Sequence, residues 1–218
     1  MKFKAVIFDL DGTLLDTIED LTDSMNSALS RMGYPAQTTE ACKQLVGDGI
    51  DVFVQRVLPL EARGNPEIAD RLKKLMRAEY QRRGERNTQP YGGVPELLDA
   101  LTERKIGLAI LSNKPHDSTL RVTKKFLSQW PWQAIFGARD GVPIKPDPAA
   151  ALEISQILNR PPEEILYVGD TNTDMWTAEA AGMYAVGVLW GFRTADELTK
   201  SGAKILISNP RELLDLLA

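Results

Sequence analysis

The 218-residue sequence contains very little cysteine and histidine, and this shortage excludes several kinds of chemistry. Cys42 is the only cysteine, so an internal disulfide and a thiolate-rich metal site are excluded. No obvious base lies beside it in TEACKQL, and we expect Cys42 to be a partly buried helix residue. His116 is the only histidine, so neither an imidazole-rich zinc site nor a mechanism with two histidines can form. Any chemistry must use carboxylates, hydroxyls, lysines and backbone amides.

The sequence also lacks an excess of basic charge and a long apolar run. Its net charge is −4 and it has no long run of Lys or Arg, which argues against nucleic acid as a partner. The opening stretch, MKFKAVIFDLDGTLLD, is too short in its apolar part and too acidic for a signal peptide or membrane span. With 43% hydrophobic and 26% charged residues, the composition is globular rather than disordered or fibrous. We therefore expect a cytoplasmic protein with no membrane partner.

Short apolar runs predict the strands of a parallel sheet. The first is KAVIF at 4–8, which ends in the acidic, glycine-containing turn DLDGT. The later candidates are IGLAIL at 106–111, ILYV at 165–168, YAVGV at 184–188 and ILI at 205–207. Strands that alternate with helices favour an α/β fold, a doubly wound parallel sheet with helices on both faces. Ligands of such sheets bind beyond the carboxyl ends of the strands, so polar residues there define a candidate site.

Between Asp16 and about Gly84 the alternation stops, and the sequence predicts only helices. The helical segments are IEDLTDSMNSALSRM, TEACKQLV, IDVFVQRVL and IADRLKKLMRAEYQRR, and a glycine ends the first and the last of them. The α/β pattern resumes after the turn-rich segment TQPYGGVPELL. We expect residues 1–15 and 85–218 to form the catalytic core and residues 16–84 to form a helical cap, with hinges at the two crossings.

Two pairs of aspartates follow predicted strands. Asp9 and Asp11 lie in DLDGT after the first strand, and Asp170 and Asp174 lie in GDTNTD after a later one. The second member of the later pair can return to the site from the first turn of a helix. Carboxylates without histidine or thiolate suit a hard divalent cation such as Mg²⁺, which prefers oxygen ligands and often binds a substrate phosphate. Without a cation, the negative charges of these carboxylates would repel one another.

Groups that suit phosphate binding occur at other predicted strand ends. Ser112 and Asn113 follow IGLAIL and offer a hydroxyl and amide donors for phosphate oxygens. Lys145, in IKPDPAAAL, offers a fixed positive charge. Each of these residues has an ordinary structural alternative, as a turn residue or a solvated lysine. The same ambiguity applies to Lys114, for which we expect at most a role at the rim of the site.

The series DLDGTLLD, LSNKP, KPDP and GDTNTD resembles the haloacid dehalogenase superfamily of phosphatases over essentially the whole chain. The resemblance implies a Rossmann-like core with a mobile helical cap inserted after the first strand. It implies that Asp9 is the nucleophile, that Asp11 is the general acid and base, and that Ser112 and Lys145 bind the transferring phosphoryl group. It further implies a Mg²⁺ site formed by Asp9, the backbone carbonyl of Asp11, and Asp170, supported or joined by Asp174.

Within that superfamily, LSNKPHD and GMYAVGVLWGFRTADEL look most like the phosphoglycolate phosphatase branch. We therefore expect a Mg²⁺-dependent hydrolase of a small phosphorylated metabolite, with 2-phosphoglycolate ranked first. The branch commonly has Thr where this chain has Ser112, which keeps the hydroxyl, and Pro where it has Gly92. The resemblance places residues 47–50 where related caps present a loop to substrate, although a turn between two helices explains them equally well. Trp190, Phe192 and Arg193 have the same ambiguity as a packed loop.

Several alternatives share parts of this pattern. A sugar phosphomutase, a pyrophosphatase or another small-ester phosphatase can have the same acid pair and cap, and only assays separate them. The presence of Asp11 disfavours a 2-haloacid dehalogenase and a phosphonate hydrolase. A receiver-like phosphorylation switch also combines acids, a hydroxyl and a lysine, but the DGT segment and the large helical insertion argue against it. The sequence does not decide between a monomer and a dimer.

Overall fold

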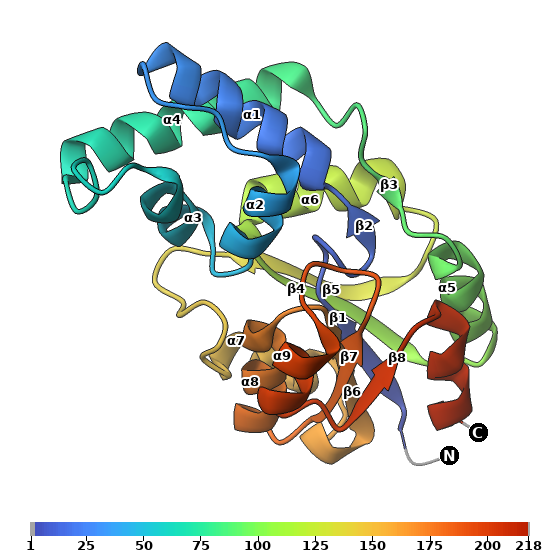
Figure 1. The fold of residues 1–218 in the computed structure, drawn as a ribbon. Helices are drawn as coiled ribbons and strands as arrows, with labels where there is room; N and C mark the ends of the chain where they lie inside the picture. Colours follow the sequence, from blue (N-terminus) through green and yellow to red (C-terminus); the bar gives the residue numbers. More distant parts are fainter. Residues whose placement is uncertain (1–2, 218) are drawn as a thin grey trace.

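In the computed structural model, which describes residues 3–217, six parallel strands form one sheet in the order β5-β4-β1-β6-β7-β8 (Figure 1). The strands are β1 (Ala5–Phe8), β4 (Gly107–Pro115), β5 (Trp132–Ala138), β6 (Ile165–Gly169), β7 (Tyr184–Val188) and β8 (Ile205–Ile207). β1 lies between β4 and β6, and Phe8 is opposite Ile110 and Val168 in the two ladders. All four residues of β1 are buried, as expected for a central parallel strand that helices cover on both faces.

The alternating side chains of β1 separate the two layers of the core. Val6 and Phe8 pack in a cluster with α5 (Val94–Glu103), α6 (His116–Phe126) and the 3₁₀ helix Pro210–Leu217. Ala5 and Ile7 pack in a second cluster with α7 (Ala149–Leu158), α8 (Asn172–Ala180) and α9 (Ala195–Lys200). This arrangement confirms the predicted doubly wound α/β fold.

The predicted strands agree with β1, β4, β6, β7 and β8, but β5 was not predicted. Its sequence, WQAIFGA, interrupts the apolar run with Gln133 and Gly137, and most of its residues are only partly buried because it lies at the edge of the sheet. β4 also continues beyond the predicted end at Leu111, so that Ser112 and Asn113 lie within the strand. The ladder to β5 is irregular in this part of β4.

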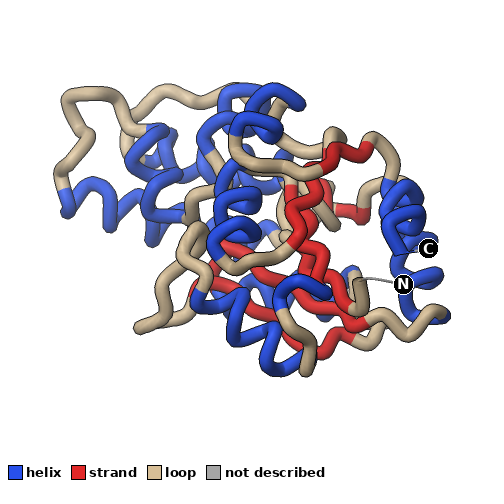
Figure 2. The backbone as a smooth tube through the Cα atoms, turned by 90° about the horizontal axis from the view of Figure 1, so that it is seen from below, coloured by secondary structure: helices blue, strands red, loops and turns tan. Residues whose placement is uncertain are grey.

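Four helices form a separate apolar cluster beyond one end of the sheet. They are α1 (Ile18–Arg31), α2 (Thr39–Leu45), α3 (Ile50–Val57) and α4 (Pro66–Arg83). Their cluster includes Met25, Leu29, Phe53 and Leu72, and Cys42 is fully buried in it on α2. Figure 2 shows the strands in one part of the molecule and only helices and loops in this other part.

A short ladder joins the two chain crossings between the helical part and the sheet. β2 (Leu15–Asp16) pairs antiparallel with β3 (Gln89–Pro90), and neither strand was predicted from the sequence. Next to this ladder, the buried carboxylate of Asp20 on α1 accepts hydrogen bonds from the backbone N–H groups of residues 86, 87 and 88. The hydroxyl of Thr88 donates another at 2.6 Å. Asp20 therefore ties the start of the helical segment to its end.

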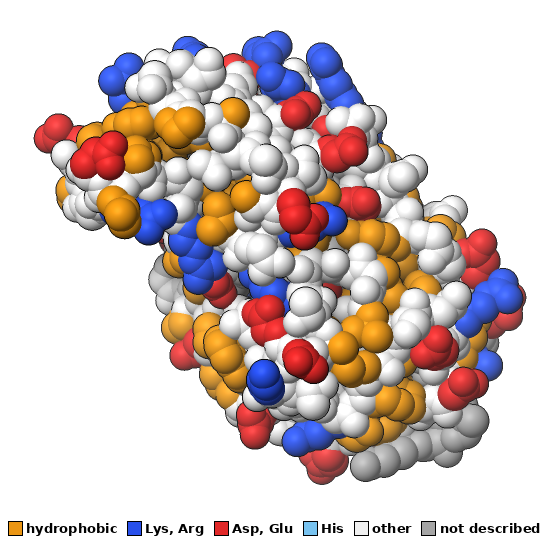
Figure 3. All heavy atoms as spheres, viewed as in Figure 1, with side chains coloured by type: hydrophobic (Ala, Val, Ile, Leu, Met, Phe, Trp, Pro, Cys, Tyr) orange, Lys and Arg blue, Asp and Glu red, His pale blue; other side chains and the backbone are white. Residues whose placement is uncertain are grey.

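The surface shows no strongly basic face in the view of Figure 3, where acidic and basic side chains are interspersed. Within residues 3–217, no helix has the length and apolar character needed to cross a membrane.

We predict that Asp20→Ala lowers the free energy of unfolding by roughly 2–4 kcal/mol, because buried backbone donors lose their acceptor. Asp23→Ala is the matched control on the same helix. Asp23 contacts Arg83 at 3.5 Å with 57% of its side chain exposed, so its loss should change stability by less than about 1 kcal/mol. Urea denaturation followed by circular dichroism measures both. Equal effects of the two substitutions would contradict the role of Asp20.

Candidate active site

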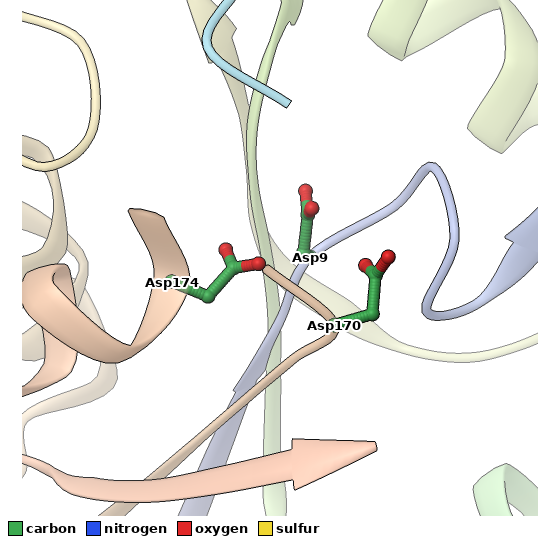
Figure 4. A group of neighbouring side chains, drawn as sticks. All are labelled: Asp9, Asp170 and Asp174. Atoms are coloured by element: carbon green, nitrogen blue, oxygen red, sulfur yellow. The ribbon is translucent and has the colours of Figure 1, made fainter. Parts of the chain in front are cut away.

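Three carboxylates meet at the carboxyl end of the sheet. Asp9 follows β1, Asp170 follows β6, and Asp174 lies in the first turn of α8 (Figure 4). Each offers one oxygen, and these oxygens all lie within 4.8 Å of one another. The turn between β6 and α8 is held by Thr171, whose hydroxyl accepts from the N–H of Asp174 and donates to its carboxylate at 2.6 Å. All three side chains are buried.

Lys145 is the cation that faces this acidic group. Its Nζ lies 2.6 Å from Asp174 Oδ1 and 3.0 Å from Asp9 Oδ1, and it donates to the carbonyl of Leu111 at 3.2 Å. Burial raises the pKa of Asp9 to about 7, although Lys145 acts in the opposite direction. Burial, Asp9 and Asp174 also raise the pKa of Asp170. One ammonium therefore leaves the negative charge of the site incompletely balanced.

The donor set fits a hard divalent cation. Its oxygens come from carboxylates, and within residues 3–217 no histidine or cysteine belongs to the group. A dication beside Asp9, Asp170 and Asp174 would balance the charge that Lys145 leaves uncompensated, and it would favour the ionised carboxylates. The carboxylate of Asp11 does not belong to this group.

Close backbone approach fixes the position of Asp170. A Cβ atom at Gly12 or at Gly191 would collide with the Asp170 side chain, and Gly12 also has a φ of +88°. The carboxylate accepts hydrogen bonds from the hydroxyl of Thr13 at 2.8 Å and from the N–H of Phe192 at 2.9 Å. The two glycines therefore leave space for the Asp170 side chain, and the two hydrogen bonds orient its carboxylate.

Asp11 has a different partner from Asp9, although only one residue separates them. Lys114 Nζ lies 3.1 Å from both carboxylate oxygens of Asp11, and it lies 4.6 Å from the ring centroid of Tyr80 on α4. Burial acts against the charge of Lys114, but Asp11 and Tyr80 outweigh it and raise the pKa of the ammonium. Lys114 is thus buried and paired, whereas the sequence suggested at most a role at the rim.

Ser112 and Asn113 are both buried beside the site, but their polar groups are used differently. The hydroxyl oxygen of Ser112 accepts from the N–H of Lys114 at 3.3 Å, which leaves the hydroxyl hydrogen able to donate to a ligand. The side-chain amide of Asn113 donates to the carbonyls of Gly47 and Lys145, each at 3.1 Å, and accepts from the N–H of Lys145 at 2.9 Å. This side chain connects three segments, and both of its donated bonds go to protein carbonyls.

The loop between α2 and α3 packs directly on the sheet-containing part. Asp48 accepts from the hydroxyl of Thr173 on α8 at 2.5 Å and pairs with Arg56 at 2.6 Å. The buried guanidinium of Arg193 donates to the carbonyls of Lys43, Gln44 and Val46. These contacts hold Gly47 and Gly49 beside Asp9, where they line the same cavity. The loop is therefore both a turn between helices and part of the cavity wall.

The sequence pattern pointed to most of these residues but missed several that hold them in place. It named Asp9, Asp11, Ser112, Asn113, Lys145, Asp170 and Asp174, and the structure places all of them at the carboxyl end of the sheet. Tyr80 was missed because a single aromatic residue in an amphipathic helix carries no signal of function. Thr13 and Thr173 were missed because hydroxyl residues are common in turns and first helical turns. The catalytic and metal-binding roles of the named residues stay predictions.

Comparison with known proteins assigns the chain to a family. Residues 6–188 match the family model for haloacid dehalogenase-like hydrolases. The chain belongs to this hydrolase family, as the sequence motifs predicted.

Two of the curated relatives are phosphoglycolate phosphatases. A phosphoglycolate phosphatase of Pseudomonas putida is 32% identical over 97% of this chain and 78% of its own length. A phosphoglycolate phosphatase of Vibrio vulnificus is 29% identical over 99% of this chain and 96% of its own length. A solved structure from Lactobacillus delbrueckii subsp. bulgaricus, provisionally assigned as a phosphoglycolate phosphatase, matches with a TM-score of 0.93 and 28% identity over 100% of this chain and 99% of its own.

We predict that Gly191→Ala weakens binding of a divalent cation by about 10- to 100-fold, because the new methyl group displaces the carboxylate of Asp170. Isothermal titration calorimetry with Mg²⁺ as the probe measures this change. Gly92→Ala is the control, since a Cβ at Gly92 meets no atom within 4 Å. Unchanged cation affinity in Gly191→Ala would show that Asp170 does not bind the ion.

Proposed function

We propose that the protein hydrolyses a small phosphate monoester through an aspartyl-phosphate on Asp9, with 2-phosphoglycolate as the first candidate substrate. The observation that carries this proposal is the position of Asp9 beside Lys145 and two further carboxylates, on the floor of a cavity beneath the helical segment. The names of the curated relatives support the choice of substrate.

Asp9 is the proposed nucleophile. A carboxylate oxygen of Asp9 attacks phosphorus, the bond from phosphorus to the ester oxygen breaks, and an acyl phosphate forms. Water then attacks the phosphorus of this intermediate, which releases inorganic phosphate and regenerates the carboxylate. One difficult displacement is thereby divided into two easier steps.

Lys145 and Ser112 are the proposed phosphoryl-binding groups. The ammonium of Lys145, 3.0 Å from Asp9, reduces the repulsion between the nucleophile and a dianionic phosphate. The hydroxyl of Ser112 donates to a phosphoryl oxygen. Asn113 acts through its neighbours, because its side-chain amide holds the backbone of Lys145 in place.

Asp9, Asp170 and Asp174 are the residues that would hold the cation, together with the backbone carbonyl of Asp11. When bound, Mg²⁺ neutralises negative charge on the phosphoryl oxygens. We choose Mg²⁺ because small hard cations prefer carboxylate oxygens and substrate phosphates.

Asp11 is the proposed general acid and base. In the first step it protonates the leaving oxygen, and in the second it takes a proton from the attacking water. Asp9 and Asp11 both line the cavity, but Asp11 pairs with Lys114 whereas Asp9 pairs with Lys145. The two acids therefore have separate environments for separate steps.

Residues 16–84 act as a cap in this proposal. Arg77 and Tyr80 of α4 line the cavity together with Gly47 and Gly49, so the helical segment roofs the nucleophile. A roof of this kind excludes water during phosphoryl transfer and limits the leaving group to a small metabolite. It favours small esters over phosphoproteins or polynucleotides.

We predict that Asp9→Asn folds but releases no phosphate, because an amide of nearly the same shape cannot attack phosphorus. The assay measures phosphate released from 2-phosphoglycolate, sugar phosphates and pyrophosphate with Mg²⁺, and excess chelator should remove the activity of the unchanged protein. Circular dichroism checks the fold. Normal turnover by Asp9→Asn would place the nucleophile elsewhere, and full activity in chelator would exclude the metal requirement.

We predict that Asp11→Asn slows the first step on an alkyl phosphate by about 10²- to 10⁴-fold, because the leaving alkoxide needs a proton. p-Nitrophenyl phosphate releases a stable phenolate, so its first step should be much less affected, while hydrolysis of phospho-Asp9 should stay slow. Stopped-flow absorbance should then show a burst of nitrophenol that approaches one equivalent per active site. Equal losses on alkyl and aryl esters without a burst would exclude Asp11 as acid and base.

A further inference from the structure

The cavity above Asp9 has apolar walls and few charges. Its volume is about 790 Å³, including the part that opens to solvent. The apolar side chains come mainly from the helical segment and are Leu21, Val46, Ile50, Phe53, Met76, Pro115 and Phe192. Among its lining residues, the charged side chains are Asp9, Asp11, Lys114 and Arg77. A negatively charged leaving group in this cavity would therefore pair with Lys114 or with Arg77.

The two cations differ in how firmly they are held. Only 4% of the Lys114 side chain is exposed, and its ammonium is fixed between the Asp11 carboxylate and the ring of Tyr80. The side chain of Arg77 is 47% exposed, and its guanidinium lies 3.7 Å from Asp117. A surface pair of this kind contributes little. Lys114 is thus the pre-positioned cation of the cavity.

The course of the reaction places the leaving group beside Lys114. In phosphoryl transfer the attacking and leaving oxygens lie roughly in line, so an ester attacked by Asp9 directs its leaving oxygen away from Asp9. Asp11 must contact that oxygen to protonate it. Because Lys114 Nζ is 3.1 Å from both oxygens of Asp11, a group one carbon beyond the leaving oxygen comes within reach of the same ammonium.

We infer that Lys114 is the specificity-determining residue of the site and that it binds a carboxylate on the leaving group. This inference rests on the proposed function and narrows the substrate to phosphate monoesters whose alcohol carries a carboxylate next to the ester carbon. An ammonium has three N–H donors, so Lys114 can bridge Asp11 and a substrate carboxylate.

The apolar surroundings of Lys114 strengthen its preference for a leaving group that carries a carboxylate. A charge pair inside apolar walls is screened less than a pair in water. A charge-assisted hydrogen bond then distinguishes an anionic leaving group from a neutral one of similar size by about 10- to 100-fold. An alkyl phosphate with an uncharged alkyl group fits between the same walls, but its leaving group gains no charge-assisted hydrogen bond from the ammonium.

The test compares kcat/KM for 2-phosphoglycolate with kcat/KM for ethyl phosphate, which lacks the carboxylate. The unchanged protein should prefer 2-phosphoglycolate by about 10- to 100-fold, and Lys114→Met should reduce this preference by about tenfold or more. Lys114→Arg keeps the charge and should retain most of the preference. The preference of the variant is divided by the preference of the unchanged protein. This ratio cancels the intrinsic difference in reactivity between the two leaving groups. It also cancels any effect on Asp11 that is equal for both esters.

Arg77→Met is the matched control, because it removes the other cation of the cavity and should preserve the preference. Collapse of the preference in Arg77→Met would assign the carboxylate to Arg77 and overturn the inference. An equal loss on both esters in Lys114→Met would also overturn it, because Lys114 would then only orient Asp11. Hydrolysis of both esters at equal rates by the unchanged protein would overturn the inference and leave the proposed function standing. Hydrolysis of neither would overturn both.

A second pair of variants keeps the test usable if Lys114→Met does not fold. Tyr80→Leu removes the ring beneath the ammonium and should reduce the preference severalfold, whereas Tyr80→Phe keeps the ring face and should retain it. An unchanged preference in folded Tyr80→Leu would contradict the requirement for a cation held in place by this ring. Circular dichroism checks the fold of each variant.

Discussion

The burial of three carboxylates at the carboxyl end of one sheet is the constraint on which the rest of the site depends. Water cannot screen the charges of Asp9, Asp170 and Asp174, so the surrounding structure must balance them. Lys145 supplies part of the balance with contacts of 2.6 and 3.0 Å. The backbone also contributes, since Gly12 and Gly191 leave the space in which Asp170 meets its two donors. The remaining imbalance is the physical reason for proposing a divalent cation.

The helical segment is held over this site by polar contacts at two separate places. At the crossings, Asp20 collects backbone donors from residues 86–88. Above the site, Arg193 and Thr173 hold the loop between α2 and α3, and Asn113 contacts the same loop through the carbonyl of Gly47. Asn113 also holds the backbone of Lys145. One side chain therefore joins the proposed cap to the proposed phosphoryl-binding lysine.

The sequence predicted those parts of the fold and site that depend on local pattern. Buried parallel strands are continuous apolar runs, which is why 184–188 and 205–207 agree with β7 and β8. The edge strand β5 lacks such a run, and β2 and β3 are too short to show a period. The acid pairs could be predicted because each follows a strand. The contact between Tyr80 and Lys114 could not, because it joins two residues that only the tertiary fold brings together.

The two early acids show why spacing alone could not assign their partners. Residues two apart in a strand lie on the same face, but β1 ends at Phe8, and the chain turns at Gly12. Asp9 therefore faces Lys145 in the buried acidic group, whereas Asp11 faces Lys114 in the cavity. Each acid has its own lysine, so the charge balance of one is largely independent of the other. A leaving group can thus bind Lys114, on the side of the site where the ester bond breaks. Such binding leaves the contact between Lys145 and Asp9, the proposed nucleophile, unchanged.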